Sequence, residues 1–364
     1  MRLKVQPKSK TMKPIAGAVL RHTDGTILDL AGRELFLGLE RFKTLVKDAD
    51  RCFICGARSS EKPFNDEHII PDWVQRSYNL RDKSIRLFNG TDFPYPKYRI
   101  RCCQECNSFL GKTFETPISA ALSRGPDQFF EWYHTEPFRV FLWLNLIYLK
   151  THLKDNQLRI ERDERAPDTR LGDAYDWAEL HHCHALIRAA RFGFEIDAEK
   201  VLGSVFVLQL GDWARQQPYD YNDHLPTHTL MIRLGEIAFI AALSDSCGVF
   251  QGLMPKIEKL PPDLSPLQFL EVLTEFQFVS AHLKYRPRYQ TEVDPQTGLV
   301  TITAALPDQF DLEELDFSLR GELMARNLNA LGQIELKGHN AEESRAMILS
   351  GDVSFFGEVG GVSP

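Results

Sequence analysis

The sequence predicts an α+β protein, with a small unit held together by cysteines and a larger mixed domain behind it. Three observations predict this class. Five of the seven cysteines lie between residues 52 and 106, where prolines break the chain into short pieces. From residue 126 onward, apolar segments of helical length alternate with shorter β-like runs. The chain has 364 residues, of which 43% are hydrophobic, and this is enough for two or three domains.

The first 49 residues are expected to form a basic arm and elements that pack on the cysteine-bearing segment. Lysines crowd the segment Lys4–Lys13, but no apolar run comes after them, so no signal peptide is indicated. Residues 17–31 carry strand and turn signals around Asp24-Gly25. Residues 33–48 place apolar side chains at mostly helical spacing, which predicts a helix there.

Residues 126–364 are expected to form an acidic α+β domain. The apolar run Phe138–Leu149 is too short to span a bilayer, so it predicts a buried helix, no membrane partner and a cytoplasmic protein. The pattern predicts helices over 127–152, 174–193 and 266–284, β-runs over 201–210, 227–234 and 237–243, a polar loop over 154–173, a hairpin over 289–306, a mixed segment ending in a helix over 311–332, and a frayed tail after Gly357.

Charge is distributed unevenly along the chain. Residues 1–125 carry 22 Lys and Arg against 14 Asp and Glu, whereas the remainder carries 21 against 36. A basic front part suits a unit that contacts nucleic acid, and an acidic rear part suits regulation, dimerisation or partner binding. Chance asymmetry between two ordinary domains is the alternative.

Two C-x2-C pairs, Cys52 with Cys55 and Cys103 with Cys106, have the spacing of zinc knuckles. Each pair places two thiolates at the tip of a turn, and two pairs complete a tetrahedral zinc site. A closed site of this kind is structural, and its binding energy stabilises the fold. Cys102 competes with Cys103, but only Cys103 has the x2 spacing to Cys106. Unliganded buried cysteines are the alternative.

Another element must be inserted between the two knuckles, because they are too far apart for a simple zinc ribbon. The inserted segment contains Glu67-His68-Ile69-Ile70-Pro71, and Asn107, Gly111 and Glu115 come after the second knuckle. These motifs resemble the HNH (ββα-metal) endonucleases, in their bacterial zinc-knuckle branch with EH-x2-P and C-x2-C-N motifs. The resemblance implies an HNH nuclease domain over 50–125, in which a ββα-metal unit carries a structural zinc.

The residue types suit hydrolysis of a phosphodiester. His68 is the candidate general base, because an ordinary histidine pKa near 6.5 suits proton abstraction at neutral pH. Glu67 and Asn107 offer hard oxygen ligands for a catalytic Mg2+ or Mn2+, and the resemblance implies the same roles. Glu115 is a further candidate ligand or positioning group, with an ordinary surface glutamate as the alternative.

Candidate contacts to nucleic acid flank the motif. Lys97, Arg99 and Arg101 alternate along a predicted strand, so one face could present all three to phosphates. Lys112 lies behind the second knuckle. A solvated strand edge is the alternative. The expected substrate is DNA, with RNA kept as a second possibility.

The middle asparagine that orients the base in many HNH nucleases has no clear counterpart here. Asn89 and Asn65 are the nearest candidates. This gap motivates a second hypothesis, in which the unit is a catalytically inactive zinc-knuckle adaptor that binds nucleic acid or protein.

The rear part carries no readable catalytic motif. His181, His182 and His184 invite a metal interpretation, but no acidic partner is evident, so we interpret them as structural. Binding a protein partner or a second copy of the chain remains its expected role. The resemblance to bacterial nucleases suggests an anti-phage or mobile-element effector, gated by this part.

Overall fold

The computed structural model describes residues 19–356, apart from 88, 162, 164, 330–334 and 337. The chain divides into two compact units. The first contains the described residues up to Val201 together with Arg288–Ala305, and the second contains Leu202–Pro287 and the described residues from Leu306 onward. Both units combine helices and strands, which confirms the α+β class. The basic segment Lys4–Lys13 and the tail after Gly357 lie outside the described residues.

The predicted boundary between residues 125 and 126 falls inside the first unit, so the helices up to Val201 belong with the cysteine-bearing segment. Within the described ranges we find no helix that combines the length and hydrophobicity of a transmembrane span.

The first unit opens with three short strands and a helix: β1 (Val19–Arg21), β2 (Ile27–Asp29), β3 (Glu34–Phe36) and α1 (Leu39–Lys47). The three strands form an antiparallel sheet whose first turn contains Gly25, as predicted. The helix predicted over 33–48 is wrong in its first part, because residues 34–36 pair with β2. Gly38 leads into the helix where a Cβ would meet the backbone oxygen of Asp24, so only glycine fits.

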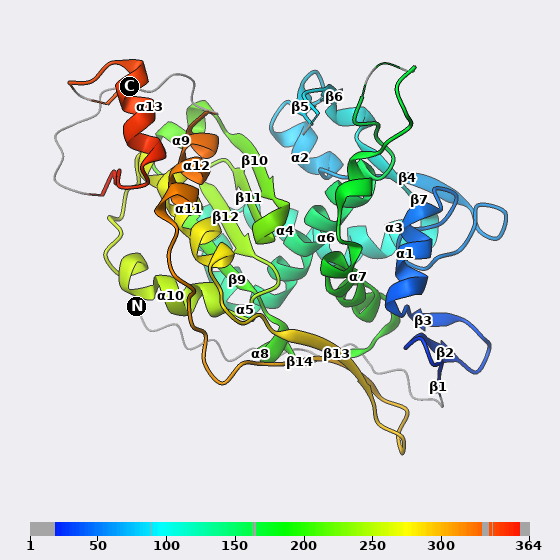
Figure 1. Cartoon of the computed structure of the whole chain (residues 1–364). Helices are drawn as coiled ribbons and strands as arrows, with labels where there is room; N and C mark the ends of the chain where they lie inside the picture. Colours follow the sequence, from blue (N-terminus) through cyan, green and yellow to red (C-terminus); the bar gives the residue numbers. More distant parts are fainter. Residues whose placement is uncertain are drawn as a thin grey trace. The chain divides into compact units, whose positions relative to one another are not determined.

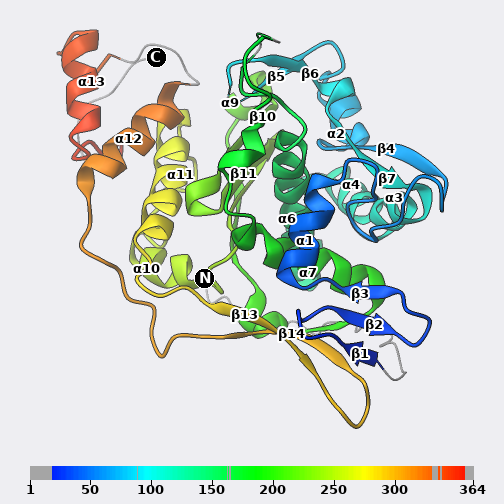
Figure 2. The ribbon, with the colours of Figure 1, turned by 45° about the vertical axis from the view of Figure 1, so that its right-hand side comes forward.

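The cysteine-bearing segment contains short paired strands and helices: β4 (Phe64–His68), α2 (Asp72–Ser77), β5 (Ser84–Arg86), β6 (Asp92–Pro94), η1 (Tyr95–Lys97), β7 (Arg99–Cys103) and α3 (Gln104–Leu110). β4 and β7 pair antiparallel, with Phe64 opposite Cys103 and His68 opposite Arg99. α3 begins directly after β7 and contacts both strands (Figure 1 and Figure 2). The predicted turn at Asn89-Gly90 joins β5 to β6.

Four helical pieces continue the first unit: η2 (Gly111–Glu115), which is a π-helical turn, α4 (Thr116–Leu122), α5 (Pro126–Thr135) and α6 (Pro137–Asp155). The prediction of a single helix over 127–152 is wrong, because the helix is interrupted at Glu136, between α5 and α6. Pro137 disfavours helical geometry in the residue before it, and Glu136 has φ −133° and ψ 40°. α6 buries the apolar run as predicted, and it also buries Lys150.

The remaining elements of the first unit are η3 (Leu171–Ala174), α7 (Trp177–Phe192), β8 (Glu195–Ile196), α8 (Ala198–Val201), β13 (Arg288–Val293) and β14 (Val300–Ala305). α7 confirms the helix predicted over 174–193. Its first turn is capped by the Asp176 side chain, and it ends at Gly193 with φ +75°. β13 and β14 confirm the predicted hairpin, and β14 pairs in parallel with β8.

The described elements of the second unit are β9 (Ser204–Gln209), α9 (Trp213–Gln216), β10 (Tyr219–His224), η4 (Leu225–Thr227), β11 (Thr229–Leu234), β12 (Ile237–Ala242), α10 (Gly248–Ile257), α11 (Pro266–Ala281), α12 (Phe317–Leu328) and α13 (Ala341–Leu349). Its antiparallel sheet has the strand order β10-β11-β12-β9. α11 contacts β11 and β12, as both views show (Figure 1 and Figure 2). The predicted strands and the predicted helix over 266–284 are confirmed, whereas the polar β10 was not predicted.

Candidate metal centre and active site

Two backbone turns bring the cysteine pairs into position. After Cys52 the chain folds back, so that Gly56 donates its amide to the Cys52 carbonyl and Cys52 donates to the Ala57 carbonyl, both at 2.9 Å. Gly56 has φ +76°, a conformation that side chains rarely adopt, which explains the glycine after the first knuckle. The second knuckle joins the end of β7 to the first turn of α3.

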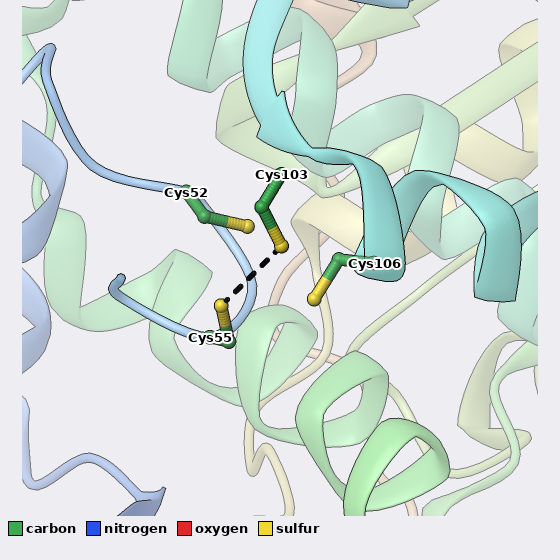
Figure 3. Close-up of side chains that lie close together, drawn as sticks. All are labelled: Cys52, Cys55, Cys103 and Cys106. Atoms are coloured by element: carbon green, nitrogen blue, oxygen red, sulfur yellow. Dashed lines mark hydrogen bonds between the residues drawn. The ribbon is translucent and has the colours of Figure 1, made fainter. Parts of the chain in front are cut away.

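The four cysteines Cys52, Cys55, Cys103 and Cys106 form one cluster. Their sulfur atoms all lie within 4.8 Å of one another, and Figure 3 shows them pointing toward a common centre. Zn–S bonds of about 2.3 Å in a tetrahedron put the sulfurs about 3.8 Å apart. The Cys55 and Cys103 sulfurs are 3.7 Å apart, so the donor set fits zinc. The predicted set, with Cys103 rather than Cys102, is the one that could hold a metal ion.

Side chains of α7 hold the first knuckle from outside the motif. His184 Nε2 lies 2.8 Å from the Phe53 carbonyl, and the Arg188 guanidinium donates to the carbonyls of Ile54, Leu35 and Glu34. Four thiolates around Zn2+ would carry a net charge of −2, and the buried guanidinium beside them offsets part of it.

Burial lowers the pKa of Arg188 to about 10, and the neighbouring cysteine sulfurs favour its charged form. These contacts could not be found from the sequence, because α7 lies more than 120 positions beyond the knuckle.

The histidines of α7 make structural contacts. His181 Nε2 lies 2.7 Å from the Leu37 carbonyl, and the His182 ring stacks on Tyr289 at 3.3 Å between centroids. Burial lowers the pKa of His184 well below its ordinary value, so the neutral ring uses its Nε2–H to bond the Phe53 carbonyl. The structural interpretation of these three residues fits the contacts.

Glu67 takes part in a buried charge cluster with residues that lie far away in sequence. Lys150 Nζ lies 2.6 Å from both Glu67 Oε1 and the His68 carbonyl oxygen, and 4.0 Å from Glu115 Oε1. The Lys150 side chain is fully buried. Burial and the negative charge of Glu67 raise the pKa of Glu115 to about 7. Glu115 is therefore part of an internal carboxylate pair, which excludes the simple surface-residue alternative.

Two carboxylates that share one ammonium group have an excess negative charge once both are ionised. A divalent cation prefers such oxygen donors, so Glu67 and Glu115 fit a Mg2+ or Mn2+ site in chemical type. In the structure, however, Glu67 is paired with the Lys150 ammonium. A divalent ion would therefore have to compete with this ammonium for the Glu67 carboxylate.

His68 and Glu67 lie on opposite faces of β4, because successive side chains alternate along a strand. The His68 face is shared with Asp66 and, across the pair, with Arg99 and Arg101. Burial, followed by the nearby charge of Arg99, lowers the pKa of His68, so the ring is neutral at pH 7.

Asn107 contacts the face of β4 that carries Glu67. Its Nδ2 donates to Asn65 Oδ1 at 3.0 Å, and Asn65 precedes Glu67 by two residues. Asn89, the other candidate for the missing middle asparagine, instead donates to the Arg159 carbonyl at 2.8 Å. The structure therefore brings Asn65 into the candidate site, on the Asn107 side rather than on the His68 side.

Three of the four candidate nucleic-acid contacts line one cleft. Lys97, Arg99 and Arg101 share it with Lys154 of α6, which the sequence did not indicate. Lys97 belongs to the turn η1 rather than to the strand, so the expected strict alternation holds only for the two arginines. Lys112 lies on η2 and does not line the cleft.

Comparison with known proteins adds no relative to this picture: no family model matches the chain, and neither a curated protein nor a solved structure matches it significantly.

Proposed function

We propose that the first unit is a metal-dependent endonuclease that hydrolyses DNA phosphodiester bonds. The observation that carries the proposal is the antiparallel pair β4–β7 running through the second cysteine knuckle directly into α3. This order of two strands and a helix is the one that the HNH resemblance implies. It joins the strand of Glu67 and His68 to the helix of Asn107, which bonds to Asn65 of that strand.

His68 would act as the general base that takes the proton of the attacking water. Its lowered pKa keeps the ring neutral at pH 7, as this role requires. Glu67 and Asn107, with Glu115 beside Glu67, would hold the divalent ion that stabilises charge on the phosphate. Because these ligands lie on the face of β4 opposite His68, the ion and the base would act on one phosphate around the end of β4, where His68 is the last residue. Zinc at the four cysteines would anchor the start of α3 and thus the position of Asn107.

A second function is favoured by one specific contact. The Lys150 ammonium lies 2.6 Å from Glu67 Oε1, where the divalent ion would have to bind. If the ammonium is permanent, the unit is an adaptor that binds nucleic acid and does not cut it.

Cleavage assays separate the two functions. Labelled duplex DNA is incubated with the full chain in Mg2+, in Mn2+ and in EDTA, and compared with Asn107→Ala. The nuclease predicts products that need the metal and vanish in the variant. The adaptor predicts retarded DNA in gels and intact strands in every metal. Exposed Asn329, at the end of α12, supplies a control as Asn329→Ala.

A further inference from the structure

A basic cleft lies on the face of the β4–β7 pair that carries His68. Its volume is about 500 Å3, and Asp66, Lys97, Arg99, Arg101, Lys154 and Gln157 contribute to its walls. Four of these side chains are cationic and one is acidic. The two arginines and Asp66 come from the paired strands, whereas Lys154 and Gln157 come from the last turns of α6 and the residues just after it.

The cations on the strand side of the cleft outnumber its carboxylate, Asp66, and are not ion-paired among the described residues. Other arginines of the segment have carboxylate partners, such as Arg58 with Asp48 at 2.8 Å. Within the part of the chain that the structure describes, no ion pair engages Lys97, Arg99 or Arg101. Arg99 Nε is buried and has no hydrogen-bond partner among the described residues. Converging cations with unused donors indicate an anionic ligand.

Lys154 completes the cleft from α6. Its Nζ donates to Gln157 Oε1 at 3.1 Å, and a half-buried ammonium held by a neutral amide keeps its full charge available to a ligand. Burial lowers the pKa of Lys154, and Asp66 partly opposes this shift. An anionic ligand in the cleft would therefore stabilise the charged form of Lys154, as Asp66 does in part.

Two aromatic rings near the cleft, those of Phe64 and Phe93, each have a cation over them. The Arg101 guanidinium lies 5.2 Å from the centre of the Phe64 ring, and the Lys154 ammonium lies 5.9 Å from that of Phe93. Among the residues that the structure describes, no aromatic side chain lines the cleft itself. Proteins that bind single strands stack bases on exposed rings, so this cleft suits a phosphate backbone whose bases are paired and turned away.

We propose that this cleft binds the phosphodiester backbone of a nucleic-acid duplex, with Lys154 as a contact residue supplied by α6. The proposal deepens the proposed nuclease function and rests on it only for the choice of nucleic acid as the anion. It places the backbone on the His68 side of the strand pair, where the candidate base is.

The test measures binding separately from cleavage. Fluorescence anisotropy in EDTA follows the full chain on duplex DNA, duplex RNA and single-stranded DNA of one sequence, over a range of salt concentrations. Each cation that contacts a phosphate contributes about 0.9 to the slope of log K against log salt for B-DNA. We expect Lys154→Gln and Arg99→Gln each to reduce the slope by about that amount, and Lys154→Arg to keep it.

Two control variants complete the design. Lys200 of α8 pairs with Asp197 at 3.2 Å. The variant Lys200→Gln should therefore have the same slope as the wild type. Asp66→Asn should bind more tightly, because it removes a carboxylate that lines the cleft. The two duplexes decide between DNA and RNA as the source of the backbone.

The proposal that the cleft binds a duplex backbone would be overturned by either of two results. One is an unchanged slope in both Lys154→Gln and Arg99→Gln, and the other is tighter binding of the single strand than of either duplex. A wild type that binds through the cleft but cuts nothing in Mg2+ or Mn2+ would instead refute the nuclease and leave the cleft standing. Equal melting temperatures of Lys154→Gln and Lys154→Arg show that a lost slope is not unfolding.

Discussion

Lys150 Nζ lies 2.6 Å from Glu67 Oε1, although the two residues are 83 positions apart. The same ammonium donates to the His68 carbonyl, so one side chain of α6 fixes both residues of the Glu67-His68 motif. Lys150 lies on the buried part of α6, directly after the apolar run, where a buried charge is tolerated only when it is paired. The candidate active site and the hydrophobic core of the first unit are therefore linked through this pair.

Replacing Lys150 by methionine should destabilise the first unit strongly. The change leaves the carboxylates of Glu67 and Glu115 buried without their cation, and breaking a buried pair typically costs about 3–5 kcal/mol. Urea unfolding followed by tryptophan fluorescence measures the loss. The double variant Lys150→Met/Glu67→Gln should recover part of it, since it removes one stranded charge. A free energy of unfolding within about 0.5 kcal/mol of the wild type for Lys150→Met would contradict a paired, buried ammonium.

Glu115 should make stability depend on pH. Its pKa is raised to about 7 in the folded chain, against 4.5 for the ordinary group. Between pH 4.5 and pH 7, the Glu115 carboxyl therefore keeps its proton in the folded state but has released it in the unfolded state. Stability from this group is complete below pH 4.5 and is lost as the pH rises through 7, by roughly 3 kcal/mol.

The Glu115→Gln variant tests this dependence. Urea midpoints at pH 5 and pH 8 should differ less in the variant than in the wild type, because the amide does not titrate. Glu131→Gln, at an exposed position of α5, should behave as the wild type does. The same pH dependence in Glu115→Gln and the wild type would mean that another group titrates.

Arg188 should be needed for tight zinc binding, although it is no ligand. It bonds three carbonyls, one of them between the cysteines of the first knuckle, and groups that orient ligands typically contribute about 10–100-fold in metal affinity. We expect Arg188→Met to lose zinc to a chelator at a correspondingly lower chelator concentration. The exposed Arg165 gives the control Arg165→Met. Equal zinc affinity in the two variants would show that the knuckle holds its shape without α7.

His68 should set the acidic limb of the pH profile of cleavage. Burial and Arg99 lower its pKa from 6.5, so the neutral, active form persists to lower pH than for an ordinary histidine. We expect kcat/KM to rise with pH through an apparent pKa below 6.5. Arg99→Gln should move this value upward, because it removes the nearby positive charge. An acidic limb at or above 6.5 that Arg99→Gln leaves unchanged would assign the limb to another group.

The sequence predicted those features of the site that depend on local spacing. Cys52 and Cys55 lie three residues apart, so their turn follows from the chain itself, and the same holds for Cys103 and Cys106. Lys150, Arg188 and Lys154 could not be predicted, because they reach the motif only through packing of α6 and α7. Those helices were expected to belong to a separate domain, since their apolar pattern gives no sign of the surface that they cover.

Local structure also explains where the predicted helices were wrong. Residues 33–48 have mostly helical spacing, yet residues 34–36 form β3 and pair with β2. The long apolar segment from 127 to 152 contains the signal for its own break in Pro137, which its hydrophobic pattern obscured.

Nicking of supercoiled plasmid tests the nuclease most directly. Wild type, His68→Ala and His134→Ala are incubated with plasmid in Mg2+ or Mn2+, where His134 is an exposed histidine of α5. We predict that wild type and His134→Ala convert the plasmid to nicked or linear forms at equal rates. A lost general base predicts a rate that is lower by about 100-fold or more in His68→Ala. Cutting by His68→Ala at the wild-type rate, or intact plasmid with the wild type in both metals, would contradict the proposed function.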